Sequence, residues 1–420
     1  MRAFGQEALT KGFADQALGI AGSMLARDAQ DSKALVLKAQ ALRALQRLPE
    51  SEAAARAAWA SARDDNQRYL AATAVAQALS LQNHRTAAQF WLRQAVQNAP
   101  NAATRQQAQQ DFNYVRSQNL LSLQFDAAIR PSSNVNNGAR DPFFHLGPFT
   151  LEIPGEQRAL SGVVGSFGLS GEYKLAETQG QTTKLTFSGS DQMVYLSQAA
   201  RDIAPDARNG HYAYQAVEIG VSRKMQPTGA ISMTVSATIG HDWYGGTALS
   251  NHQSLEFQVD HTLASDILGF ADATLQRQNR LDNKAASSTA TDLSIGVAKQ
   301  AARGDVIRLT LNFDRTNSAA VGVDHSGLGA NLDWQHAKPV LGMELAGSVG
   351  ISRTDYRTSS FASDGRHDVQ VTASLSATLN KIGYLGFSPV VAITFARNAS
   401  NIAFNDTQTF GLSLSVKSRF

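Results

Sequence analysis

From Leu120 onwards, hydrophobic and polar residues alternate with a period of two, which is the side-chain period of a β-strand. The last alternating stretch, residues 407–420, is polar on one face. Its other face carries the apolar residues Phe410, Leu412, Leu414 and Val416. Such a strand needs a neighbour on both sides, because open strand edges in lipid leave backbone groups without hydrogen bonds. We therefore expect it to close a membrane β-barrel by pairing with the strand that begins near Leu120.

Fourteen alternating segments can be counted in this part of the chain. They lie near residues 120–130, 158–175, 181–195, 211–225, 229–243, 248–263, 266–281, 288–301, 304–317, 323–338, 340–356, 365–381, 383–398 and 405–420. Most exceed the roughly 5–6 residues of strands in soluble sheets and reach the roughly 9–11 residues with which a tilted strand crosses a bilayer. Short and long connections alternate, as periplasmic turns and external loops do in outer-membrane barrels. A soluble sandwich shares the alternation, but the lengths favour a 14-stranded antiparallel transmembrane β-barrel.

Residues 5–118 show small and apolar residues at helical spacing instead. Helices are expected at about 5–27, 32–46, 50–63, 67–81, 84–98 and 101–118. Ala54 and Ala88 lie 34 residues apart, each in the second helix of a pair, and Pro100 ends the later pair as in a tetratricopeptide repeat, or TPR. We expect an α-helical TPR-like solenoid over residues 1–118 and the barrel domain over residues 119–420.

The first helices of such pairs line a concave groove that can bind a peptide. Arg43, Gln46 and Gln77 are the candidate client-binding residues on that surface. The alternative is a scaffold of stacked helices without a ligand. An even number of strands puts both ends of the barrel on the side of the membrane that holds this helical region.

Composition excludes several classes of function. The 38 basic residues nearly balance the 35 acidic ones, and no dense Lys/Arg block indicates nucleic-acid binding. The chain has no cysteine, which removes disulfides, thiolate catalysis and Cys-ligated zinc. No apolar run approaches the roughly 18 residues of a membrane helix. The first residues, MRAFGQEALTKGF, lack the apolar core of a signal peptide, so for an exported protein this numbering would describe a trimmed chain.

The sequence contains no Gly-x-Ser-x-Gly, His-Glu-x-x-His, Walker-type or Gly-x-Gly-x-x-Gly motif. The histidines are dispersed. His241, His252 and His261 lie on or beside neighbouring predicted strands, where lumen or loop positions explain them better than a metal site does. We therefore expect no enzymatic activity, no catalytic residue, no cofactor and no metal.

The connection at residues 131–157 is too long for a tight turn, and its prolines and glycines argue against a regular strand. Its three phenylalanines would be costly on a loop exposed to water, so we expect them to pack in the lumen or against the rim. The candidate residues for a lumen plug or gate are Asn134, Asn136, Phe143, Phe144 and Phe149. An ordinary external loop is the alternative.

A helical repeat region joined to a barrel whose first strand runs into Pro131-Ser-Ser-Asn134-Val-Asn136 resembles the surface lipoprotein assembly modulators, the Slam family. The resemblance implies a Gram-negative outer-membrane protein with its N-terminal domain in the periplasm. It also implies that the terminal Phe420 serves as the assembly signal read by the barrel-assembly machinery, so deleting Phe420 should impair membrane assembly.

The function that the resemblance implies is an outer-membrane translocon or assembly factor that delivers lipoproteins, or related secreted proteins, to the cell surface. Its expected partners are the exported client protein and the outer membrane, and not nucleic acid. Two alternatives stay open on the residues alone: a TPR-containing exopolysaccharide exporter and a nutrient porin. The short helical region and about fourteen strands favour the translocon.

Overall fold

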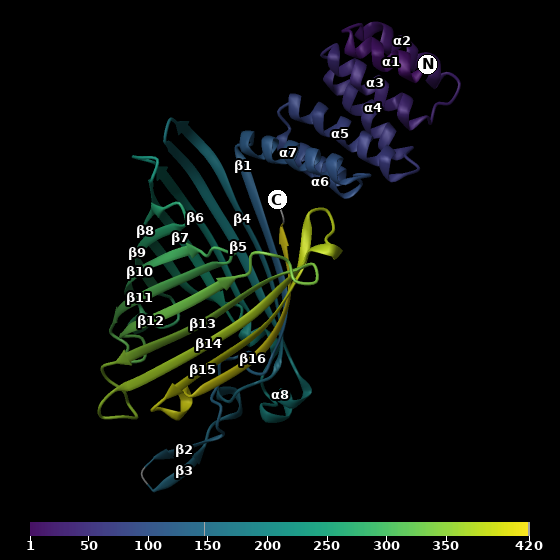
Figure 1. Cartoon of the computed structure of the whole chain (residues 1–420). Helices are drawn as coiled ribbons and strands as arrows, with labels where there is room; N and C mark the ends of the chain where they lie inside the picture. Colours follow the sequence, from purple (N-terminus) through teal and green to yellow (C-terminus); the bar gives the residue numbers. More distant parts are fainter. Residues whose placement is uncertain (147, 419–420) are drawn as a thin grey trace. The chain divides into compact units, whose positions relative to one another are not determined.

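The structure, a computed structural model, describes residues 1–146 and 148–418 of the 420 (Figure 1). Phe420 therefore lies outside the described residues. The chain divides into two compact units, each considered by itself below. One holds Met1–Ser122 with the short segment Gly383–Phe387, and the other holds Leu123–Ile382 and Ser388–Lys417.

The first unit is helical, as its sequence predicts. Its helices within the described residues are α1 (Arg2–Thr10), α2 (Ala14–Leu25), α3 (Ser32–Ala44), α4 (Leu48–Ala60), α5 (Asp65–Leu81), α6 (Arg85–Gln97) and α7 (Ala102–Gln118). Three starts are fixed by side chains that accept backbone N–H groups: Asp31 for α3, Asp64 for α5 and Asn101 for α7. The single helix expected over 5–27 is wrong, because Gly12, at φ 83°, ends α1 and lets the chain turn into α2.

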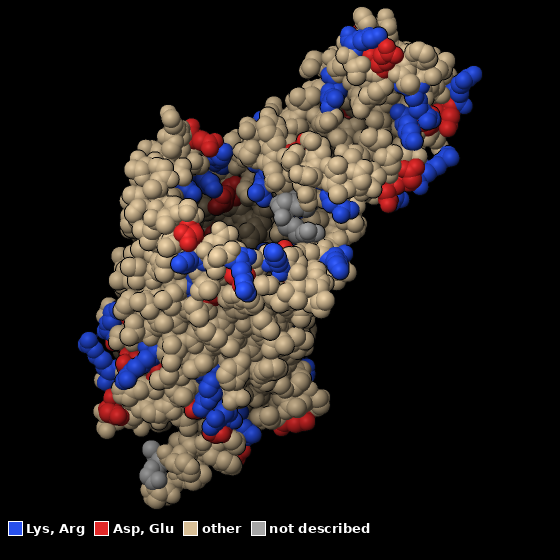
Figure 2. All heavy atoms as spheres, in the orientation of Figure 1, with Lys and Arg blue, Asp and Glu red and all other residues tan. Residues whose placement is uncertain are grey.

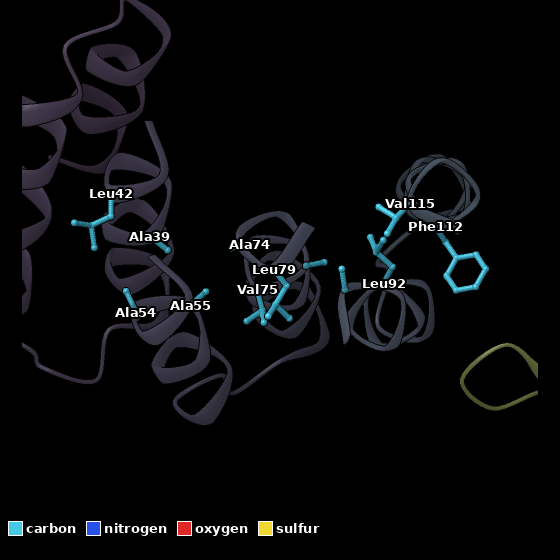
Figure 3. Packing of buried hydrophobic residues seen from close by; sticks show 12 residues of the cluster. Ala39, Leu42, Ala54, Ala55, Ala74, Val75, Leu79, Leu92, Phe112 and Val115 are labelled. Atoms are coloured by element: carbon cyan, nitrogen blue, oxygen red, sulfur yellow. The ribbon is translucent and has the colours of Figure 1, made fainter. Parts of the chain in front are cut away.

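Alanines at the helix contacts allow the helices to approach closely. Ala54 and Ala88, the two residues that mark the repeat, are both buried, and so are the larger Leu42 and Phe112 (Figure 3). The turns after α3 and α5 each contain a residue in the left-handed region, which is the same device that Gly12 provides after α1. Three helix pairs with a common turn geometry and a final α7 therefore form this unit.

The second unit is a closed antiparallel barrel of fourteen strands among the described residues, in agreement with the sequence. They are β1 (Leu121–Ser132), β4 (Gly162–Thr178), β5 (Gln181–Leu196), β6 (Tyr214–Met225), β7 (Ile231–Tyr244), β8 (Thr247–Ala264), β9 (Ile267–Arg280), β10 (Ser288–Gln300), β11 (Val306–Ser318), β12 (His325–Gln335), β13 (Met343–Tyr356), β14 (Arg366–Leu379), β15 (Phe387–Ser400) and β16 (Thr407–Ser418). The expected closure is confirmed, since β1 pairs with β16 through Ala128↔Ser415 and Ile129↔Leu414.

The alternation predicted from the sequence separates two faces of the wall. Apolar side chains such as Ile239 and Leu255 point outward and stay exposed, at 59% and 52% of their surface. The residues between them point inward and are mostly polar. On the face that Figure 2 shows, charged side chains gather at the two ends of the barrel and are nearly absent from the flank between them. An uncharged outer band of this kind suits a lipid bilayer.

The connection after β1 contains regular structure that the sequence does not predict. β2 (Phe143–Leu146) and β3 (Phe149–Glu152) pair as a hairpin, with Phe144 opposite Leu151. The expectation that prolines and glycines prevent strands here is wrong, because Pro142 and Pro154 flank the hairpin.

No helix within residues 1–146 and 148–418 is long and apolar enough to cross a membrane.

Candidate functional site

The candidate groove residues of the helical unit have different local roles. Arg43, in the last turn of α3, donates a hydrogen bond to the side chain of Gln77 on α5. The two residues are 34 positions apart, so they occupy equivalent places in successive repeats. Partial burial lowers the pKa of the Arg43 guanidinium. Gln46 is exposed and sits at φ 61°, where its backbone N–H bonds to the carbonyl of Arg43. The structure thus joins Arg43 to Gln77 and gives Gln46 a place in the helix turn.

The inner wall of the barrel carries a buried polar network on β6, β7 and β8. Asp242 is 4% exposed and accepts hydrogen bonds from the hydroxyls of Ser250, at 2.6 Å, and Tyr214, at 2.9 Å. His252 Nδ1 lies 3.2 Å from Asp242 Oδ2, and its Nε2 lies 3.0 Å from Glu218 Oε1. Each polar group therefore has a partner within the wall. The only sign of this network in the sequence is that all five residues fall on the inward-facing positions of their strands.

The three histidines considered for a metal site do not converge. His241 points outward, where its Nδ1 lies 2.6 Å from Asn251 Oδ1, whereas His252 points inward. His261 pairs with Ile231, at the opposite end of β8. Among residues 1–146 and 148–418, no group of three His, Cys, Asp or Glu side chains could hold a metal ion.

Charges of both signs line the rest of the inner wall. Arg308 lies over the ring of Phe270, with its guanidinium carbon 4.4 Å from the ring centre. Arg366 lies over Tyr356 at 3.4 Å and pairs with Asp368 at 3.2 Å. A wall of this composition is hydrated and can form hydrogen bonds with a polar molecule in the lumen. It offers little apolar surface to which an extended chain could adhere.

The two candidate asparagines of the loop after β1 bind the loop to itself. Asn134 is 6% exposed, donates to the carbonyl of Gly138 and accepts from the N–H of the same residue, both at 2.9 Å. Asn136 donates to the carbonyls of Glu156, at 2.9 Å, and Arg158, at 2.8 Å. It also accepts the N–H of Leu160 at 2.9 Å. The Ser-Asn-Val-Asn stretch at the start of the loop is therefore hydrogen-bonded to residues 156–160 at the end of the loop.

Gly138 allows the start and the end of the loop to approach this closely. A Cβ on Gly138 would lie 2.3 Å from the carbonyl oxygen of Arg158 and 2.8 Å from that of Gln157. Both contacts are with backbone, which has little freedom to move away. No side chain fits at this position, and the chain needs glycine there to cross so closely.

The phenylalanines lie at the loop end of the barrel, not between its strands. The β2–β3 hairpin extends beyond the strand ends, on the same end of the barrel as α8 (Gln198–Ile203) (Figure 1). Phe144 packs against Phe404, in a tilted arrangement, and against Phe361, edge to face, with ring centres 4.6 and 6.5 Å away. Phe143 and Phe149 are 50% and 65% exposed. In this structure the hairpin lies beyond the strand ends, and both a plug or gating role and an external loop stay predictions.

The foot of the loop and α8 share a small hydrophobic core that the sequence does not reveal. Leu160, Val164 and Val194 are buried with Ala200 of α8. Gly155 touches the end of α8 so closely that a Cβ there would lie 2.2 Å from the carbonyl oxygen of Ile203. This core brings together segments that are distant in the sequence, so no local pattern could announce it.

The loop also bridges the closure of the barrel. The N–H of Ser133 donates to the carbonyl of Phe410 at 3.0 Å, and the N–H of Arg140 donates to the carbonyl of Asp406 at 2.8 Å. The Arg140 side chain pairs with that of Asp406 at 3.5 Å. We call these contacts between the loop after β1 and the start of β16 the clasp.

Comparison with known proteins identifies a family. The surface lipoprotein assembly modifier profile matches residues 219–420, from within β6 to the end of the chain. No curated protein matches the sequence. Similar solved structures include Acinetobacter baumannii OccAB3 (8% identity, 70% of this chain and 98% of that chain, TM-score 0.37). A bacterial polysaccharide outer membrane secretin is 8% identical over 70% of this chain and 98% of that chain, with a TM-score of 0.39. An anion-selective porin from Comamonas acidovorans is 10% identical over 71% of this chain and 99% of that chain, with a TM-score of 0.37.

The family match covers ten of the fourteen barrel strands wholly and a further one in part, and it agrees with the resemblance inferred from the loop motif and the helical repeats. Residues 219–420 form a domain of the surface lipoprotein assembly modifier family, the Slam family of outer-membrane β-barrels, which exports lipoproteins to the cell surface.

Proposed function

We propose that this protein delivers lipoproteins, or related secreted proteins, across the outer membrane to the cell surface. In this proposal the helical unit lies in the periplasm and receives the client, and the barrel provides the passage. The observation that carries the proposal is the family match over residues 219–420. The client, the barrel-assembly machinery and the lipid bilayer are the proposed partners.

The inner wall supports a passage for polypeptide. Its charges are mixed in sign, as in Arg366 and Asp368, and the buried carboxylate of Asp242 is hydrogen-bonded within the wall. An unfolded chain would therefore meet water and polar side chains, and would not have to cross a strong electrostatic field of one sign. The proposal includes no covalent step and assigns no catalytic residue.

The decisive experiment uses a surface lipoprotein of the same bacterium as the candidate client. Both proteins are produced in a Gram-negative host that lacks relatives of this chain, and the client is digested by protease added to intact cells. We expect surface digestion only when this protein is present. A client that stays protected, while the barrel reaches normal outer-membrane levels, would refute the proposal. A matched client whose acylated cysteine is replaced by alanine distinguishes lipoprotein from soluble cargo.

The helical unit's role needs a separate test. Arg43→Ala and Gln77→Ala each remove the bond between α3 and α5 and change the proposed groove. We expect both to weaken retention of the client by the immobilised full-length protein. Arg47→Ala is the matched control, since Arg47 is an exposed residue that pairs with Glu50. Circular dichroism at 222 nm verifies that the helices persist. Equal retention by all three variants would leave the unit as a scaffold.

A further inference from the structure

A groove of about 650 Å³ lies on the outward face of β6–β9. The groove exists because the side chain of Ala237 is much smaller than the side chains that surround it on the outward face. In the register of the sheet, Ala237 lies between Val221 on β6 and Leu255 on β8. Ile239 borders it along the same strand and is 59% exposed. A methyl group among branched side chains leaves a channel with apolar walls on the surface that faces lipid.

The groove becomes polar toward the end of the barrel that carries the long loops. A second hollow, of about 540 Å³, shares Ile239 and Gln253 with the first and adds His241, Asn251 and Asn279. Cross-strand pairing orders these residues in rows. Ala237 pairs with Leu255, Ile239 with Gln253 and His241 with Asn251. Over four residues along β7, the outward face thus changes from entirely apolar to largely polar.

Arg277 supplies a positive charge at the boundary. It lines the first hollow, pairs directly with Gln253 across β8 and β9, and is exposed. Its guanidinium donates to Thr289 Oγ1 at 2.9 Å and to Asn279 Oδ1 at 3.3 Å. Both partners are neutral, and no carboxylate among residues 1–146 and 148–418 forms an ion pair with Arg277. An arginine on the lipid-facing side of a barrel is most destabilising at the bilayer midplane and is tolerated near the interface, where its charge can meet an anionic headgroup.

We propose that this outward face of β6–β9 binds an acylated, phosphate-bearing lipid of the outer leaflet. One acyl chain occupies the channel over Ala237, and the phosphate meets the Arg277 guanidinium. Gln253, Asn251 and Asn279 provide hydrogen bonds to the polar part of the same molecule. The guanidinium fork suits the oxygens of a phosphate. The site is separate from the lumen, and its existence does not depend on the export activity proposed above.

The test uses the full-length protein in detergent, titrated with bis-phosphorylated lipid A and with the same lipid after removal of its phosphates. Native mass spectrometry gives the bound fraction. We expect the phosphorylated form to bind about tenfold more tightly, since a charge-assisted contact of this kind corresponds to about one decade. Arg277→Gln should abolish that preference, and Arg277→Lys should keep part of it. Equal binding of the two lipids by the unaltered protein would overturn the proposal.

Two further variants test the acyl channel. Ala237→Leu fills it and should weaken both forms of the lipid alike. Ala330→Leu is the matched control, because Ala330 also faces outward, between Leu311 and Ile351 on the neighbouring strands. Undiminished binding by Ala237→Leu would overturn the assignment of the channel. Stronger retention of an uncharged triacylated lipopeptide than of lipid A would also overturn the proposal, and would assign the channel to the acyl chains of a client. Heat-modifiable gel mobility shows that each barrel is folded.

Discussion

Replacing Asn136 by alanine should open the loop after β1 while the barrel stays closed. The side chain makes three hydrogen bonds to backbone, with Glu156, Arg158 and Leu160. Losing such a bond costs about 1 kcal/mol net, or about 1–3 kcal/mol where the loss leaves a buried N–H without an acceptor. Leu160 is fully buried, so its N–H would be left in that state. Since water can replace part of the contact at Glu156, we expect a loss of about 3 kcal/mol for the loop.

Hydrogen–deuterium exchange of the full-length protein measures this loss directly. A change of about 3 kcal/mol corresponds to an increase of about two decades in the exchange rate of the Leu160 amide, read from peptides that cover residues 155–162. The amides of β7 and β8 should keep their protection, because the strand ladders do not involve Asn136. Unchanged heat-modifiable mobility provides the second check that the barrel is closed.

The matched control is Asn137→Gly. Asn137 is exposed and sits at φ 52°, a region that glycine occupies without strain, so this variant should exchange no faster than the unaltered protein. If Asn136→Ala also exchanged at the original rate, Asn136 would not hold the loop. If β7 and β8 lost protection together with Leu160, the loop would be inseparable from the barrel fold, and the reasoning would fail in the opposite direction.

Three other outcomes follow from the geometry. Gln46→Gly removes the cost of a left-handed non-glycine residue and should stabilise the helical unit by about 1 kcal/mol in thermal melts followed at 222 nm; no gain would refute this. Deleting residues 143–152 should leave the conductance in planar bilayers unchanged, because the hairpin lies beyond the strand ends, whereas large steady currents would establish a plug. The hydrogen bond from Arg280 lowers the pKa of Asp282 to about 2, so this pairing should persist at pH 4 and be lost only as the pH falls through about 2; an NMR titration midpoint near 4 would contradict it.

The barrel was predictable because its signal is local and repeated. A period of two assigns every residue of a strand to one face, and a one-residue error would move all of them, so the alternation around Ile239 or Leu255 fixes the wall without knowledge of its neighbours. Closure between β1 and β16 follows from the need to satisfy both edges in lipid. The helical repeats were predictable for a similar reason, since Ala54 and Ala88 mark one contact twice at a spacing of 34 residues.

The loop was not predictable in the same way, because its structure depends on contacts between distant residues. Asn136 bonds to carbonyls 20 and 22 positions away, and Asn134 reaches the carbonyl of Gln408, at 3.4 Å. A sequence shows two asparagines and leaves open whether they meet a client, the lumen or the chain itself. The buried network around Asp242 was hidden likewise, since its members are ordinary inward residues until the register of β6–β8 brings them together.

The polar inner face and the apolar outer face of the barrel wall suit different parts of a lipoprotein. The protein part of a lipoprotein suits the polar lumen, but each methylene group of its acyl chains gains about 0.8 kcal/mol on leaving water, so a chain of sixteen carbons would lose roughly 12 kcal/mol if it crossed a hydrated lumen bare. The charged side chains of the inner wall, such as Arg366 and Asp368, provide no apolar surface for the acyl chain. The outward face over Ala237 does, and beside the loops the clasp joins the loop after β1 to the start of β16. Export of a lipid-anchored client through this fold therefore requires the acyl chains to be shielded by another part of the client, or the wall to part at its closure between β1 and β16.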